Sequence, residues 1–230
     1  MMTPPDHAMA GIDCWIFDLD NTLYPLSAGL FDQIDERMGA FIMRLVGGDP
    51  VEARAIQKRY FHDHGTTMSG LMRHHDVAPE DFLTFVHDVD MAAIRPDAAL
   101  TEALAALPGR RHIFTNADAD YAAKVLAARG IDHLFDVIVD VRVTGYVPKP
   151  EHAAYRRMAE ALPDFVPGRS LFVDDMTRNL VPARAMGMTT VWLDNGSEAG
   201  NRGHDPAHVD HHIDDLTRWL QGVVAKGERA

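Results

Sequence analysis

The sequence has one cysteine, no long apolar run and no excess of positive charge. Cys14 alone cannot form a disulfide within the chain, which excludes a disulfide-stapled fold, and its apolar surroundings predict a buried small hydrophobe. No apolar run approaches the length of a membrane-spanning helix, and residues 1–10 lack the apolar centre of a signal peptide. These absences predict a cytoplasmic protein with no membrane partner.

The charge balance limits the classes of partner. The chain has 22 Lys and Arg residues and 34 Asp and Glu residues, which gives a formal net charge of -12. Nucleic-acid polymers and anionic membranes need a basic face, so neither is an expected partner. A small anionic substrate remains compatible, because one lysine or one bound cation can dominate the field inside a single pocket.

The spacing of apolar residues along the chain changes near residues 24 and 95. An apolar strand over 12–17 precedes a stretch whose apolar residues recur at helical spacing, and Asp49-Pro50 opens one of its helices as cap and first residue. We predict a helical cap domain at 25–95, inserted after the first strand. The remaining residues, 1–24 and 96–230, would form the catalytic core.

The predicted core alternates strands with helices. Strands are expected at 111–115, 137–140, 170–173 and 189–193, with a last one near Ile213. This alternation predicts a parallel sheet covered by helices on both faces. The fold class is therefore α/β, a Rossmann-like doubly wound sheet with an inserted helical cap.

Polar residues follow the predicted strands where ligands bind to such sheets, beyond the carboxyl ends. Asp18 and Asp20 follow the first strand, Thr115-Asn116 the second, Lys149 the third and Asp174-Asp175 the fourth. If the first strand continued, Asp18 and Asp20 would share one face and repel each other unless a cation, a proton or a reaction relieved the charge. The alternative is a polar turn that ends a buried strand.

Carboxylates with a hydroxyl, an amide and a lysine are typical of an oxygen-ligand site for a hard divalent cation, with Mg²⁺ the first choice. A phosphate group would bridge the metal, Lys149 and Thr115. Pro148 and Pro150 fix the backbone around Lys149, which favours a positioned charge. The alternative for Lys149 is an ordinary solvated lysine.

These residues resemble, in order and spacing, the four motifs of the haloacid-dehalogenase-like superfamily. The motifs read Asp18-Leu19-Asp20-Asn21-Thr22, Thr115-Asn116, Lys149-Pro150, and Asp174-Asp175 with Asn179, and the resemblance spans residues 13–193. It implies a Mg²⁺-dependent phosphomonoesterase acting on a small phosphorylated substrate. The dehalogenases of the superfamily lack the second aspartate of the first motif, so Asp20 favours a phosphatase.

The resemblance also implies a role for each site residue. Asp18 would be the nucleophile and form an aspartyl-phosphate, while Asp20 would act as general acid and base. Mg²⁺ would be held by Asp18, the Asp20 carbonyl and Asp175. Asp174 would orient Lys149, and the phosphoryl oxygens would be bound by Thr115, Asn116 and Lys149. Asn179 would cap the following helix and form hydrogen bonds around the metal site.

The cap carries a second, shorter resemblance, to pyrimidine 5′-nucleotidases, at residues 61–67, 70–71 and 86–90. Within it, Thr66 and Thr67 follow Gly65 in a polar turn suited to a base or ribose; the alternative is that Thr67 only caps a helix. We therefore predict a pyrimidine nucleoside 5′-monophosphate phosphatase. The alternatives are a phosphatase of small sugar phosphates or phosphoglycolate, and a non-catalytic phosphate-binding or partner-binding module.

Overall fold

A computed structural model describes residues 9, 11–163, 165–197, 200–202 and 205–227, and its centre is a six-stranded parallel sheet. The strand order is β3-β2-β1-β4-β5-β6, with every neighbouring pair parallel. This doubly wound order confirms the predicted fold class. The strands are β1 (Cys14–Phe17), β2 (Arg110–Phe114), β3 (Val137–Val139), β4 (Ser170–Asp174), β5 (Thr189–Leu193) and β6 (His211–Ile213).

The central strand β1 is apolar on both faces because both faces are covered. Trp15 and Phe17 pack into one hydrophobic core, and Cys14 and Ile16 pack into the other. Successive side chains of a strand point to opposite faces, so four consecutive apolar residues are what a central parallel strand requires. Cys14 is buried, as predicted.

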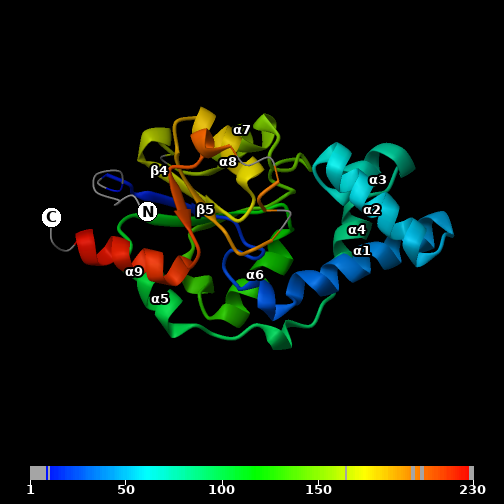
Figure 1. Ribbon diagram of the computed structural model, residues 1–230, viewed down its shortest axis with the longest axis horizontal. Helices are drawn as coiled ribbons and strands as arrows, with labels where there is room; N and C mark the ends of the chain where they lie inside the picture. The colour runs from blue at the N-terminus through cyan, green and yellow to red at the C-terminus, as the bar shows by residue number, and fades with distance from the viewer. Residues whose placement is uncertain (1–8, 10, 164, 198–199, 203–204, 228–230) are drawn as a thin grey trace.

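Helices form a layer on each face of the sheet (Figure 1). One layer holds α7 (His152–Ala161) and α8 (Thr177–Ala185). The other holds α5 (Ala98–Ala105), α6 (Ala119–Arg129) and α9 (Leu216–Gly227). Among the described residues, no helix combines the length and the apolar character needed to cross a bilayer.

A separate group of helices lies between β1 and β2 in the chain and beside the sheet in space (Figure 1). It comprises α1 (Leu30–Val46), α2 (Pro50–His64), α3 (Thr67–His75) and α4 (Pro79–Val86). Asp49 caps α2 by accepting from the Glu52 N–H, as its sequence predicts. The cap of α3 is Thr66, not Thr67, so the capping alternative for Thr67 is wrong. The division of the chain into two domains stays a prediction.

Hydrogen bonds from Arg142, Tyr146 and Arg178 are among the polar contacts that join this helical group to the rest of the molecule. Arg142 donates to both carboxylate oxygens of Glu80 on α4, at 2.9 and 2.7 Å, and Tyr146 donates to Glu80 at 2.6 Å. These hydrogen bonds, that from Arg142 above all, lower the pKa of Glu80 to about 2. On another side, Arg178 of α8 donates to the carbonyl oxygen of Gly65 at 3.0 Å. These hydrogen bonds help to fix helices α1 to α4 against the sheet side of the molecule.

Candidate active site

Strand register places two of the predicted carboxylates side by side. β1 and β4 are paired with Phe17 opposite Val173, so the next residues, Asp18 and Asp174, are neighbours at the carboxyl edge of the sheet. The Asp18 N–H donates to the Val173 carbonyl at 2.9 Å and continues the ladder by one bond. Asp174 ends β4 and is fully buried.

Lys149 lies between these two carboxylates. Its ammonium donates to Asp18 Oδ1 at 2.6 Å, Asp174 Oδ2 at 2.8 Å and the Phe114 carbonyl at 2.9 Å. Its three N–H donors therefore have three acceptors, and the side chain is 1% exposed. Burial alone would lower the pKa of Lys149, but attraction to Asp174 and Asp18 outweighs it and raises that pKa. The alternative of a solvated lysine is wrong.

Asn116 holds the main chain of this lysine. Its Oδ1 accepts from the Lys149 N–H at 2.8 Å, and its Nδ2 donates to the Lys149 carbonyl at 3.3 Å. Both polar atoms of the side chain are thus bonded already, and phosphoryl binding by Asn116 stays a prediction. The neighbouring Thr115 accepts from the Ala117 N–H at 3.0 Å, which leaves its hydroxyl proton to donate.

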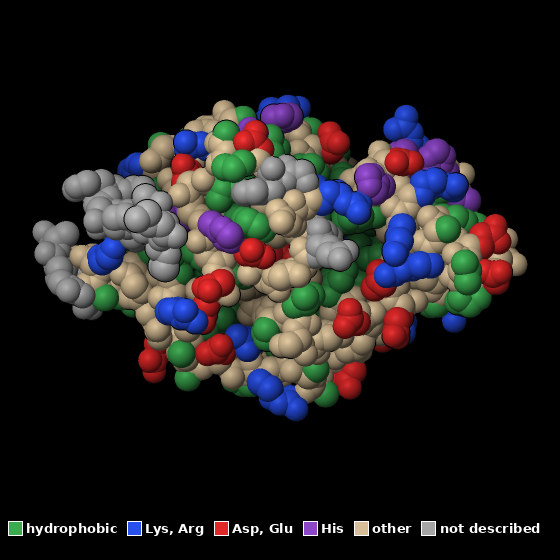
Figure 2. All heavy atoms as spheres, in the orientation of Figure 1, with side chains coloured by type: hydrophobic (Ala, Val, Ile, Leu, Met, Phe, Trp, Pro, Cys, Tyr) green, Lys and Arg blue, Asp and Glu red, His purple; other side chains and the backbone are tan. Residues whose placement is uncertain are grey.

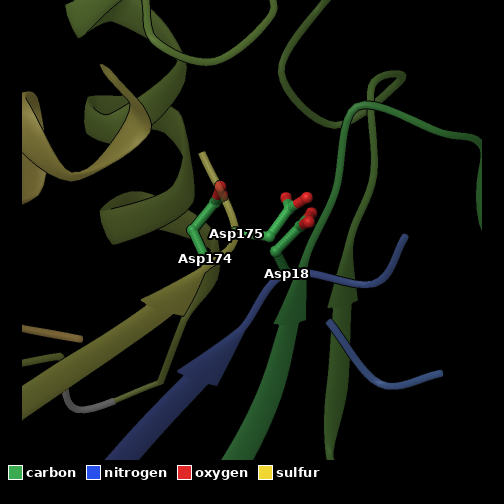
Figure 3. A group of neighbouring side chains, drawn as sticks. All are labelled: Asp18, Asp174 and Asp175. Atoms are coloured by element: carbon green, nitrogen blue, oxygen red, sulfur yellow. The ribbon is translucent and has the colours of Figure 1, made fainter. Parts of the chain in front are cut away.

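Three carboxylates converge beyond the strand ends (Figure 3). Asp18, Asp174 and Asp175 each offer an oxygen within 4.8 Å of the others. Burial first, and then repulsion within the group, raises the pKa of Asp175 and raises that of Asp18 to about 7 despite the attraction of Lys149. Three carboxyl groups thus share one lysine in a buried place, and a divalent cation would allow all three to ionise.

Asp174 is the least available of the three to a metal ion. Its Oδ1 accepts from the Met176 N–H at 2.8 Å, and its Oδ2 accepts from Lys149. The Asn179 Nδ2 donates to both oxygens, at 2.9 and 3.0 Å. Asp18 and Asp175 are therefore the side chains that could hold a cation. Asn179 lies inside α8 and does not cap it, because the capping position belongs to Met176; that part of its predicted role is wrong.

Asp20 does not share a strand face with Asp18. The strand ends at Phe17, and the chain turns where the Thr22 and Leu23 N–H groups donate to the Leu19 carbonyl. Asn21 has a φ of 58°, a left-handed conformation that asparagine tolerates. The turn, rather than a continued strand, sets the direction of the Asp20 side chain, and Asp20 still lines the same pocket as Asp18.

Two tyrosines hold the Asp20 carboxylate. Tyr24 and Tyr121 both donate to Asp20 Oδ1, at 2.7 and 2.8 Å. Burial and the adjacent Asp20 charge raise the pKa of both phenols, so both remain protonated donors at neutral pH. Because both bonds end on Oδ1, they leave Oδ2 for other contacts. The sequence reasoning missed both tyrosines, although Tyr24 stands four residues after Asp20.

A pocket of about 530 Å³ opens over this edge of the sheet. Every predicted site residue except the fully buried Asp174 lines it: Asp18, Asp20, Thr66, Thr67, Thr115, Asn116, Lys149, Asp175 and Asn179. Thr66 and Thr67 come from the helical group and the others from the sheet side. The two parts meet at Gly65, where a Cβ atom would lie 3.8 Å from Pro148 Cγ and 3.9 Å from the Lys149 carbonyl oxygen. The structure therefore brings the cap turn and the core motifs into one pocket.

Comparison with protein families gives one match over most of the chain. A family model described as haloacid dehalogenase-like hydrolase matches residues 12–187. Among curated proteins, Phosphate metabolism protein 8 of Saccharomyces cerevisiae is 24% identical over 234 residues, which cover 94% of this chain. The chain covers 66% of that relative, slightly less than two thirds of its length.

Solved structures share the fold at low identity. A protein described as a predicted phosphoglycolate phosphatase from Haemophilus somnus is 20% identical, with a TM-score of 0.60 over 93% of this chain and 98% of that one. The L-2-haloacid dehalogenase of Xanthobacter autotrophicus is 17% identical, with a TM-score of 0.56 over 92% and 98%. At these identities the likeness concerns the fold alone, and the chemistry has to be argued from the side chains.

Proposed function

The chain belongs to the haloacid dehalogenase-like hydrolases, and from this membership and the geometry of the site we propose that it is a Mg²⁺-dependent phosphomonoesterase. One observation carries the choice of a phosphatase over a dehalogenase. In the part of the chain that the structure describes, Asp18, Asp174 and Asp175 lie together, and Lys149 is bonded to Asp18 and Asp174. A site with this excess of buried negative charge suits a cation and a phosphoryl group.

Mg²⁺ fits the donor set, which is made of carboxylate oxygens and offers neither sulfur nor imidazole. The residues proposed to hold it are Asp18, Asp175 and the carbonyl oxygen of Asp20. When bound, the ion would offset the negative charge of the transferring phosphoryl group. Asp174 has its oxygens occupied by Lys149, Asn179 and Met176, and would orient the lysine.

In the proposed reaction, a carboxylate oxygen of Asp18 attacks phosphorus and the bond to the leaving alkoxide breaks. Asp20 donates the proton that the alkoxide needs, and then accepts a proton from the water that hydrolyses the aspartyl-phosphate. Tyr24 and Tyr121 keep the Asp20 side chain in place through Oδ1. The Thr115 hydroxyl binds a phosphoryl oxygen, with the Asn116 main chain as a further donor. Lys149, whose three N–H groups are already bonded, attracts the phosphoryl group through its charge or exchanges one of those bonds for a phosphoryl oxygen.

The activity test uses two substrates that distinguish a phosphatase from a dehalogenase. With Mg²⁺ present, the protein should release phosphate from an aryl phosphate and should release no chloride from L-2-chloropropionate. Chelation of the metal with EDTA should abolish phosphate release, and added Mg²⁺ should restore it. Chloride release, or phosphate release that persists through chelation, would contradict the proposal; absence of both activities would favour the non-catalytic alternative.

For the leaving group we propose a pyrimidine nucleoside, on the dimensions and lining of the pocket. Its volume of about 530 Å³ lies within the range of roughly 300–1,000 Å³ that accommodates drug-sized ligands. Glycolate or a small sugar would leave much of it unfilled. The pocket lining includes apolar side chains that suit a planar base: Phe31, Met38, Phe61, Met68, Phe82 and Val86.

The selectivity prediction concerns the turn at Thr66. Uridine and cytidine 5′-monophosphates should give a higher kcat/KM than purine nucleotides, phosphoglycolate or sugar phosphates, because hydrogen bonds discriminate better than packing alone. Thr66→Ala or Thr67→Ala should narrow the gap between pyrimidines and purines. Because the Thr66 hydroxyl also accepts from the Ser69 N–H at 3.1 Å, Thr66→Ser is the matched control that keeps the helix cap. A preference for a non-nucleotide would overturn the nucleoside assignment and leave the phosphatase in place.

A further inference from the structure

The pocket above Asp18 has an outer part lined by basic side chains. Arg54, Lys58 and His62 follow one another at intervals of four residues along α2, so they share one face of that helix, and all three line the pocket. Arg178 and Arg202 line it as well. Lys58, His62 and Arg202 are exposed whereas Asp18 and Lys149 are buried, so the cationic part lies at the mouth.

Most of these cations lack a carboxylate partner. Arg54 is the exception, because it donates to Asp35. Within the part of the chain that the structure describes, neither Lys58 nor Arg202 belongs to an ion pair. In a protein of net charge -12, a group of unpaired cations around one opening is unexpected on composition alone. Figure 2 shows Lys and Arg side chains on both sides of the hollow between the sheet and helices α1 to α4.

Arg178 reaches deepest of the outer cations. Its guanidinium lies 4.4 Å from the centre of the Phe61 ring, and its Nη2 donates to the Gly65 carbonyl. A guanidinium has five N–H donors, and its Nε–H is buried without a partner among the described residues. Arg178 therefore keeps a spare donor, and its hydrogen bond to Gly65 ends on a neutral carbonyl rather than on a carboxylate.

We propose that Lys58, Arg178 and Arg202, with His62 at the rim, form a second anion site that binds a phosphate group on the leaving group. This inference rests on the proposed phosphatase function and names its substrate class: nucleotides that carry another phosphate besides the scissile one, such as nucleoside bisphosphates. The deep part holds the scissile phosphoryl group against Asp18 and Lys149, the apolar middle holds the base, and the outer cations hold the second phosphate. The alternative is a solvated basic rim with no ligand.

The test is a binding measurement that does not depend on turnover. Asp18→Asn protein with Mg²⁺ should bind uridine 3′,5′-bisphosphate about 10–100-fold more tightly than uridine 5′-monophosphate in calorimetry, the gain expected from charge-assisted hydrogen bonds. The difference should shrink as salt is added, because the outer cations are exposed. Lys58→Gln and Arg202→Gln should each reduce the ratio of the two affinities. Arg59→Gln is the matched control on the same helix, because Arg59 does not line the pocket, and it should leave the ratio unchanged.

Equal affinity for the two nucleotides would overturn the second anion site, as would a ratio that Lys58→Gln and Arg202→Gln leave intact. Turnover by the wild-type protein separates this failure from failure of the proposed function. Uridine 5′-monophosphate and an aryl phosphate would still be hydrolysed with Mg²⁺ if only the anion site is wrong. If the protein hydrolyses neither uridine 5′-monophosphate nor the aryl phosphate but still binds the bisphosphate selectively, the anion site is supported and the phosphatase function is contradicted.

Discussion

Asp18→Asn should lower kcat by about 10⁶-fold, the scale observed when an enzyme loses its nucleophile. A carboxamide cannot form the aspartyl-phosphate, and the remaining groups of the pocket can bind substrate but not replace the attacking oxygen. The measurement is single-turnover phosphate release with Mg²⁺, together with trapping of beryllium fluoride on the wild-type protein. Turnover close to that of the wild type would contradict the assignment of Asp18 as nucleophile.

The same variant gives an independent readout in its stability. Burial raises the pKa of Asp18 to about 7, above the value of about 4 for an exposed aspartate, so the folded protein holds this proton more tightly than the unfolded chain. The free energy of unfolding of the metal-free wild type should therefore fall as pH rises from about 4 to about 7. Asp18→Asn has no carboxyl group to ionise and so avoids this loss of stability. Its Tm at pH 8 should therefore equal or exceed that of the wild type. A variant that melts far below the wild type at pH 8 would contradict the charge argument.

Lys149→Met should be the most destabilising change in the site and should also abolish activity. Methionine keeps the length of the side chain but removes the ammonium that bonds Asp18, Asp174 and the Phe114 carbonyl. Removing one partner of a buried ion pair costs about 3–5 kcal/mol. For a chain of this length that corresponds to a fall in Tm of roughly 6–20 °C, which thermal melting in metal-free buffer would measure.

Lys124→Met is the matched control for this experiment, because it removes the same charge from an exposed position on α6. It should change Tm by no more than about 2 °C, the scale of an ordinary surface substitution. Acidification provides a second check. Protonated Asp18 no longer needs the ammonium, so the destabilisation by Lys149→Met should shrink as the pH falls below about 7, the pKa of Asp18. Equal effects of the two substitutions would show that the buried lysine is not required for stability.

The sequence predicted those parts of the site that depend on strand ends. In a parallel sheet the carboxyl ends of all strands lie at one edge, so Asp18, Thr115 and Asp174 had to be neighbours once the strands were recognised. The sheet and the helices that cover it followed from periodicity and caps. The position of Lys149 was harder to predict, because it lies in a loop after β3 that the Asn116 side chain holds in place.

Contacts between distant segments could not be predicted from the sequence. Tyr121 is 101 residues from the Asp20 carboxylate that it bonds, and Arg178 is 113 residues from Gly65. No local pattern encodes such pairs, since they depend on how α6 and α8 pack around the pocket. The same limit applies to the direction of the Asp20 side chain, which the turn after Phe17 decides, because a period of two cannot be extended past the end of a strand.

The bond from Arg178 to Gly65 ends on a main-chain oxygen, which every amino acid possesses. Substitutions at Thr66 or Thr67 therefore need not break the contact that seats the turn over the core. During divergence, the side chains of this turn could change one at a time while its main chain kept its position over the pocket that Asp18 lines. Preference among leaving groups could drift without an inactive intermediate in the lineage. Directed evolution of new substrate preferences should accordingly start at these two threonines and keep Arg178 fixed.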